Sequence, residues 1–252
     1  MEMVLLTALG VGGATVIGSV LGFIFQKISH RFSDLVLSFA AGVMLAAAVI
    51  GLIIPSLEHG GSWGFPVAIL GIFCGAFCLN LMDRLVPHLH RLSGVEPEAH
   101  PAGNQQLNKV LLFVMAIAIH NLPEGIAAGV GFGSGDNAHA ISIAAGIDLQ
   151  NIPEVMVIIG PMLAAGMKPG RTFLCAIATG VIEVLGTLLG YFAVSISAAI
   201  LPFALAFAGG TMLYVISDEM IPETHAHGEE RGATYALLAG FCLMLAMTYF
   251  LG

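Results

Sequence analysis

The chain has 252 residues, of which 58% are hydrophobic and 10% are charged, and its mean hydropathy is +0.95. A soluble domain carries about a quarter charged residues, because its surface must meet water. The composition therefore excludes a soluble enzyme, a nucleic-acid-binding protein and a disordered chain. The 32 glycines and the formal net charge of −8 favour a polytopic helical membrane protein without a polybasic surface.

Continuous apolar runs follow one another along the chain, and each can supply the roughly 20 residues of a membrane-spanning helix. Because these runs do not alternate with polar residues, they argue against an outer-membrane barrel. The first run follows no basic segment and is long for a signal-peptide core, so we expect a retained span. The eight predicted spans of this all-α integral membrane protein cover residues 3–25, 35–55, 65–86, 110–133, 139–165, 171–193, 198–217 and 232–251. Residues 1–252 are expected to form a single transmembrane domain, with one long polar loop at 87–109.

The basic residues test this topology, because they gather on the cytoplasmic side of a membrane protein. With eight spans, all of them fall on one side and none on the other: Lys27, Arg31, Arg84, Arg91, Lys109, Lys168, Arg171 and Arg231. The partition supports the span count and predicts that the N- and C-termini are both extracytoplasmic. It also places the loop at 87–109 in the cytoplasm.

Three predicted spans carry polar or ionisable residues, which are costly inside a membrane and therefore point to function. They are His120-Asn121-Leu122-Pro123-Glu124-Gly125 in the fourth span, Asp148-Leu149-Gln150-Asn151-Ile152-Pro153-Glu154 in the fifth, and Glu183 in the sixth. The pattern Asn-x-Pro-Glu occurs at 121–124 and again at 151–154. Consecutive spans run antiparallel, so this duplication indicates an inverted repeat with a site near the membrane midplane.

The spacing of these residues predicts a metal-binding site. His120 and Glu124 lie one turn apart on one helical face, and Gln150 and Glu154 repeat that relation. Neighbouring ionised glutamates would repel one another, and a divalent cation would relieve that repulsion. One imidazole among carboxylate and amide oxygens suits Zn²⁺, Fe²⁺, Mn²⁺ or Cd²⁺, whereas Mg²⁺ and Ca²⁺ prefer oxygen ligands alone. Asp148 has two interpretations, an entry pathway or the capping of polar backbone.

A second polar cluster is predicted at the cytoplasmic ends of the third and seventh spans. Its members are Asp83, His88, His90, Asp218, Glu219, His225 and His227. The histidine pairs are expected in loops. Either they are simply solvated, or they form a weak exit or regulatory metal site, since imidazoles that titrate near neutrality suit transient binding.

The two Asn-x-Pro-Glu motifs resemble the fourth- and fifth-span motifs of the ZIP (Zrt/Irt-like protein) family of divalent-metal transporters, in the bacterial GufA-like form. The resemblance implies a ZIP-like bundle with a binuclear metal site. It implies that His120, Glu124, Gln150 and Glu154 line the first metal position, with Met44 as a thioether ligand. The second position is implied to be lined by Asn121, Glu124, Asn151, Glu154 and Glu183. Among the cytoplasmic residues, the resemblance most favours a metal-binding role for Glu219.

The family also implies an elevator-like motion, in which spans 1, 4, 5 and 6 move against a scaffold of spans 2, 3, 7 and 8 that forms a homodimer surface. The predicted function is import of Zn²⁺, and also cadmium, iron and manganese, across a bacterial inner membrane. The metal is the transported substrate, and no cofactor is expected. An intramembrane metalloenzyme is disfavoured because the chain has no HExxH motif and no Ser or Cys nucleophile beside His120. A metal-sensing receptor is the other alternative.

Overall fold

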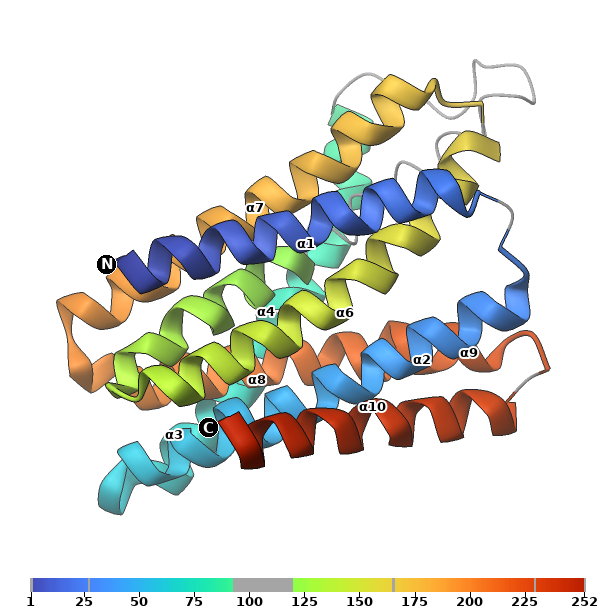
Figure 1. Cartoon of the computed structure of the whole chain (residues 1–252). Coiled ribbons are helices and arrows are strands. Elements are labelled where there is room, and N and C mark those ends of the chain that lie inside the picture. Colours follow the sequence, from blue (N-terminus) through green and yellow to red (C-terminus); the bar gives the residue numbers. More distant parts are fainter. Residues whose placement is uncertain (1, 27, 93–119, 165, 229, 252) are drawn as a thin grey trace.

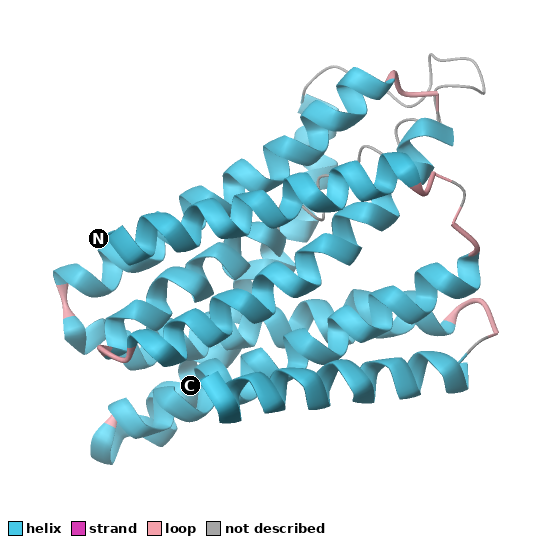
Figure 2. Cartoon of the chain, in the orientation of Figure 1, coloured by secondary structure: helices cyan, strands magenta, loops and turns pink. Residues whose placement is uncertain are grey.

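The computed structural model of the chain describes residues 2–26, 28–92, 120–164, 166–228 and 230–251. Within these ranges the ordered elements are helices, and no strand occurs (Figure 2). The α-helices are α1 (Glu2–Ile24), α2 (His30–Ala46), α3 (Ile54–His59), α4 (Gly64–Leu92), α6 (Asn137–Ala164), α7 (Pro169–Ile196), α8 (Leu201–Val215), α9 (Ile221–His225) and α10 (Glu230–Leu251). A further helix covers residues 120–131. The shorter elements are the π-helices η1 (Ala47–Ile53) and η5 (Ile216–Met220) and the 3-10 turns η2 (Gly61–Trp63), η3 (Phe132–Ser134) and η4 (Ala198–Ile200).

Seven helical segments within the described ranges are long and apolar enough to cross a membrane. They are Glu2–Ile24, His30–His59, Gly61–Met82, Asn137–Ala164, Pro169–Ile196, Leu201–His225 and Glu230–Leu251. Each overlaps one predicted span, which confirms the all-helical membrane architecture. The remaining predicted span, 110–133, is helical over 120–131, and residues 110–119 lie outside the described part of the chain. The count of eight spans therefore stays a prediction.

The helices pack as two groups that meet along α2 and α6 (Figure 1). The first, called here the α1 group, contains α1, helix 120–131, α6 and α7, with α1 lying against both α6 and α7. The second, called the α2 group, contains α2, α4, α8 and α10, with α2 against α10 and α4 against α8. This division follows the one that the family resemblance implies for the predicted spans.

Glycine allows the closest of these helix contacts. A Cβ added at Gly18 of α1 would lie 2.6 Å from the carbonyl oxygen of Ile152 in α6, and one at Gly22 would lie 2.8 Å from that of Met156. Only a residue without a side chain fits such an approach, and membrane helices associate largely through packing of this kind. Gly18 and Gly22, which form a GxxxG pair, therefore serve the packing of α1 against α6.

Two prolines explain two irregular stretches of helix. Pro55 lies in the first turn of α3, just after η1, and Pro222 lies in the first turn of α9, just after η5. Neither proline has the N–H that would bond to the carbonyl four residues earlier. For Pro55 that carbonyl belongs to Gly51, and its oxygen lies 3.2 Å from Nε2 of His139, at the start of α6. A histidine of the α1 group thus bonds to the backbone that proline leaves open in the α2 group. π-Helices of this sort are frequent at functional sites.

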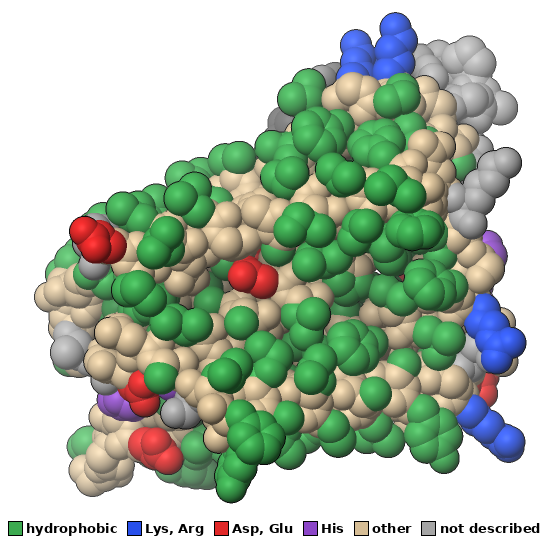
Figure 3. All heavy atoms as spheres, in the orientation of Figure 1, with side chains coloured by type: hydrophobic (Ala, Val, Ile, Leu, Met, Phe, Trp, Pro, Cys, Tyr) green, Lys and Arg blue, Asp and Glu red, His purple; other side chains and the backbone are tan. Residues whose placement is uncertain are grey.

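Both chain ends lie at one end of the bundle (Figure 1), as the predicted even number of spans requires. Among the described side chains, Lys and Arg gather at the opposite end (Figure 3). Arg31 begins α2, Lys168 precedes α7, and Arg231 begins α10, so these residues come from three different connections. The charge partition predicted from the sequence is therefore present in the described part of the fold.

At three places a helix runs further than the predicted span. Helix α4 continues to Leu92, beyond the predicted span end at 86, because Leu85, Leu89 and Leu92 keep the helical spacing past Pro87. His88 and His90 therefore lie on a helix and not in a loop.

The seventh span continues through η5 and α9 to His225, and the second begins at His30 and not at residue 35. Hydropathy marks where polar side chains begin, whereas these helices end where their backbone hydrogen bonds end.

Candidate metal-binding site

Helix 120–131 carries the first motif and lies directly against α7. A Cβ at Gly125 would collide with the carbonyl oxygen of Glu183, and a Cβ at Gly186 would lie 2.6 Å from the carbonyl oxygen of Leu122. Gly129 and Gly190 repeat the same reciprocal contacts one turn further on. This glycine-lined contact holds the two backbones together, so Glu124 and Glu183 lie within electrostatic reach of each other.

Amide side chains of α6 bind two of the buried carboxylates. Gln150 Nε2 donates to Glu124 Oε1 over 2.8 Å, and Asn151 Nδ2 donates to Glu183 Oε1. All four side chains are at most 1% exposed. The residues of the two motifs and Glu183 are therefore brought together, as the sequence predicts, by three helices of the α1 group.

The other oxygen of each of these side chains is buried and has no hydrogen-bond partner. The unpartnered atoms are Glu124 Oε2, Glu183 Oε2, Gln150 Oε1 and Asn151 Oδ1, and Asn121 Oδ1 joins them. Buried polar atoms are nearly always hydrogen-bonded, because leaving one unpaired costs about 1–3 kcal/mol. Five unpaired oxygens in one buried cluster present acceptors alone, which is the arrangement that a cation satisfies.

Glu154 and Glu183 both lie near Glu124 in this cluster, so the three carboxylates would repel one another when ionised. Among the described residues, no three His, Cys, Asp or Glu side chains are gathered closely enough to hold a metal ion. Part of the reason is the pairing described above, in which amide groups of α6 bind Glu124 and Glu183. Cation binding at these oxygens therefore requires small rotations of side chains that already share one space.

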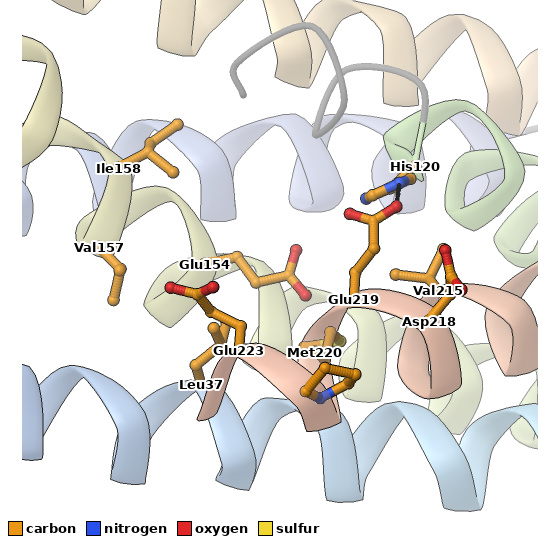
Figure 4. Close-up of a pocket in the computed structure, with 11 residues that line it drawn as sticks. Leu37, His120, Glu154, Val157, Ile158, Val215, Asp218, Glu219, Met220 and Glu223 are labelled. Carbon is orange, nitrogen blue, oxygen red and sulfur yellow. Dashed lines mark ion pairs between the residues drawn. The ribbon is translucent and has the colours of Figure 1, made fainter. Parts of the chain in front are cut away.

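His120 joins the α1 group to the α2 group. Its Nε2 lies 2.8 Å from Oε1 of Glu219, which η5 carries (Figure 4). The two residues line a cavity of about 410 Å³ together with Glu154, Asp218 and Glu223. Figure 4 shows the side chain of Glu154 extending toward Glu219. The cavity therefore connects the motif residues to the acids at the end of α8.

A second cavity, of about 720 Å³, continues from the first, since Leu37, Val157 and Glu223 line both. His227, in the connection after α9, places Nδ1 3.2 Å from Oδ1 of Asp34 on α2. Asp34 is 3% exposed and its Oδ2 has no partner. The ring of His30 stacks on that of His227 with centroids 5.0 Å apart. Polar side chains therefore continue from Glu154 to the end of the bundle that carries the basic residues.

The other predicted site residues are placed as follows. Met44 is fully buried and belongs to the apolar core that also contains Ala128 and Ile147. His225 is the last residue of α9, not a loop residue, and its Nδ1 lies 2.8 Å from the carbonyl oxygen of Ile221. The side chains of Asp83, His88 and His90 lie outside the described residues, so their part in a cytoplasmic metal site stays a prediction.

The sequence interpretation missed Asp34 and His30. The predicted second span begins at residue 35, which places both residues outside the membrane-spanning part of the chain. The signal was available, because Ser29 is a good helix N-cap and its side chain accepts a hydrogen bond from the backbone N–H of Phe32. A helix beginning there would have identified Asp34 as an acid inside a span.

Comparison with known proteins identifies the family. The family model described as "ZIP Zinc transporter" matches residues 93–248. The zinc transporter GufA of Myxococcus xanthus is 39% identical over 98% of this chain and 98% of its own length. The chain belongs to the ZIP family. The zinc transporter ZIPB of Bordetella bronchiseptica is also 39% identical, over 95% of this chain and 78% of its own length. The zinc transporter ZupT of Chlorobaculum parvum is 31% identical over 92% of this chain and 91% of its own length.

Membership confirms the resemblance inferred from the two motifs. It makes this chain a multi-pass membrane transporter of the ZIP family and not an enzyme. The alternative of an intramembrane metalloenzyme is thereby removed.

Proposed function

We propose that this ZIP-family protein imports Zn²⁺ into the bacterial cytoplasm across the inner membrane, through a midplane site in the α1 group. The observation that carries the proposal is the cluster of five unpartnered buried oxygens around Glu124 and Glu183. The names of the relatives support zinc as the transported ion. Cadmium, iron and manganese share the preference for mixed imidazole and oxygen ligands and are proposed as further substrates.

The site holds up to two cations in this proposal. His120, Glu124, Gln150 and Glu154 line the first position, with Met44 beside it, and Asn121, Glu124, Asn151, Glu154 and Glu183 line the second. Gln150 and Asn151 already contact Glu124 and Glu183, so each position needs its amide to turn its oxygen toward the ion. The ion then replaces hydrogen bonds between ligands with bonds to the metal.

Release toward the cytoplasm follows the two connected cavities. Glu219 competes with the cation for His120, because a 2.8 Å ion pair and a metal bond to the same nitrogen exclude each other. Glu223 lines both cavities, and the Asp34–His227 pair lines the second, so carboxylates and imidazoles accompany the ion outward. Asp218 belongs to the same exit path, as do Asp83, His88, His90 and His225 in the sequence-based proposal.

The two helix groups suit an elevator-like motion. The metal ligands other than Met44 belong to the α1 group, whereas Glu219 belongs to the α2 group. Movement of the α1 group would therefore carry the site past Glu219 and Asp34. The same proposal includes four further features. They are the orientation with both termini outside, the eighth span, the single domain over residues 1–252 and a homodimer surface on the α2 group.

Uptake of radioactive zinc tests this function. Proteoliposomes containing the full chain are compared with those containing Glu124→Gln or Glu154→Gln, and Glu58→Gln serves as the matched control because Glu58 is exposed. We expect uptake to fall at least about tenfold in the first two variants, the range seen when groups supporting a metal are lost, and to be retained in the control. Unlabelled Cd²⁺, Fe²⁺ and Mn²⁺ are then added as competitors. Accumulation of radioactive zinc in intact cells reports the direction of transport. Equal uptake by the parent and Glu124→Gln would refute the site.

A further inference from the structure

Asp148 is an acid inside a membrane-spanning helix that the proposed function does not use. It lies on α6 beside the fully buried Ile147 and is itself partly buried. Its Oδ1 is buried and has no hydrogen-bond partner, and no cation among the described residues pairs with it. Such a group is costly in a membrane and indicates a function.

The side chain lies in the contact between α6 and α1. A Cβ added at Gly10 of α1 would lie 3.3 Å from Oδ2 of Asp148. Further along the same two helices, Gly18 packs against Ile152 and Val155. Positions 148, 152 and 155 form one helical stripe that faces α1. The side chain of Asp148 therefore lies against α1 beside Gly10, with its Oδ1 buried.

The same contact leads to the unpartnered oxygens of the metal-binding site. Asp148 interacts electrostatically with Glu183, and it precedes Asn151 by one turn of α6. The side chain of Thr15, also on α1, lies next to Gly180 one turn before Glu183. Asp148 Oδ1, Asn151 Oδ1 and Glu183 Oε2 are all buried and unpartnered. Three unpartnered acceptor oxygens thus share the space that α1 covers, with the Thr15 hydroxyl as the neighbouring donor.

We infer that Asp148 is a further ligand of the second cation position, which it forms together with Asn151 and Glu183. This inference rests on the proposed function. Asn151 is neutral, so when both positions are filled two divalent ions face only the three carboxylates of Glu124, Glu154 and Glu183, and Asp148 supplies a fourth. Because α6 begins at Asn137 on the side of the chain ends, Asp148 is also the first of the three that an ion from that side meets.

Metal binding by the purified full-length protein tests this inference, with Cd²⁺ titrated calorimetrically and bound metal counted after dialysis. Asp148→Asn is expected to weaken one of two cation affinities by about ten- to a hundredfold and to leave the other unchanged. Asp148→Glu restores the charge and is expected to recover part of the loss. Asp136→Asn is the matched control, because it removes the same charge at the start of α6 while Asn keeps the cap to Ala138.

A second pair of variants serves if Asp148→Asn does not fold. Gly10→Ala places a methyl group 3.3 Å from Asp148 Oδ2, whereas Gly13→Ala meets no atom within 4 Å. Only Gly10→Ala is expected to weaken the cation affinity that Asp148→Asn weakens. The inference is overturned if Asp148→Asn binds metal as Asp136→Asn does, or if it weakens both affinities equally. Wild-type protein that takes up no zinc defeats the proposed function, whereas normal uptake with an unchanged second affinity in Asp148→Asn defeats this inference alone.

Discussion

Substituting Gly125 with alanine tests whether the helix contact behind the metal-binding site sets its geometry. The new Cβ would lie 2.9 Å from the carbonyl carbon of Glu183 and 3.0 Å from the backbone nitrogen of Thr187. Ordinary carbon contacts are about 3.5–4.0 Å, and the carbonyl oxygen of Glu183 is nearer to the new Cβ than either of these atoms, so helix 120–131 and α7 must separate by about 1 Å or more. Because Glu183 is on α7, this shift changes its distance to Glu124.

The effect on folding is smaller than the effect on transport. Overpacking costs about 1–3 kcal/mol, and the better helix propensity of alanine returns about 1 kcal/mol. The free energy of unfolding should therefore fall by about 0–2 kcal/mol, while zinc affinity and uptake fall about tenfold or more.

Thermal unfolding in detergent and zinc uptake in proteoliposomes measure the two effects separately. Gly13→Ala is the control, since its Cβ meets no atom within 4 Å. If Gly125→Ala transports zinc as fast as Gly13→Ala, the idea that this contact positions the ligands is wrong.

Two further variants address the side-chain pairs. Asn151→Asp replaces the hydrogen bond to Glu183 with repulsion, so we expect a lower unfolding temperature without metal. We also expect a larger stabilisation by Zn²⁺, because tenfold tighter binding adds about 1.4 kcal/mol to the free energy of unfolding. An unchanged zinc-induced shift in thermal unfolding would contradict this expectation. Glu219→Gln removes the charge that competes with the cation for His120, so uptake should slow while calorimetric zinc affinity at the position that His120 lines should rise. Uptake at the wild-type rate would show that Glu219 has no part in release.

The sequence predicts the helices well because spanning a membrane imposes a length and a polarity that can be counted. The seven long apolar helices of the described residues each coincide with a predicted span. Helix ends were less predictable. Pro55 and Pro222 come after π-helices whose backbone bonding depends on neighbours, such as His139 at the Gly51 carbonyl. Those neighbours are distant in sequence, so local patterns do not reveal them.

The metal-binding site was likewise predictable in part from the sequence. The residue types and the helical spacing of Glu124, Asn151 and Glu183 were sufficient to predict that they share a buried cluster. Their pairing was not predictable, because Gln150 with Glu124 and His120 with Glu219 depend on how three or four helices are rotated. The Gln150–Glu124 pair joins residues 26 positions apart, whereas the His120–Glu219 pair joins residues about a hundred positions apart.

The reciprocal glycines between helix 120–131 and α7 also bear on how metal preference can change during evolution. Because backbone meets backbone there, the relative position of Glu124 and Glu183 does not depend on the identity of neighbouring side chains. Positions 121, 150 and 151 can then vary among amides, acids and imidazoles without reshaping the fold around them. Selectivity would be free to diversify in such a protein while the architecture that supports it stays constant.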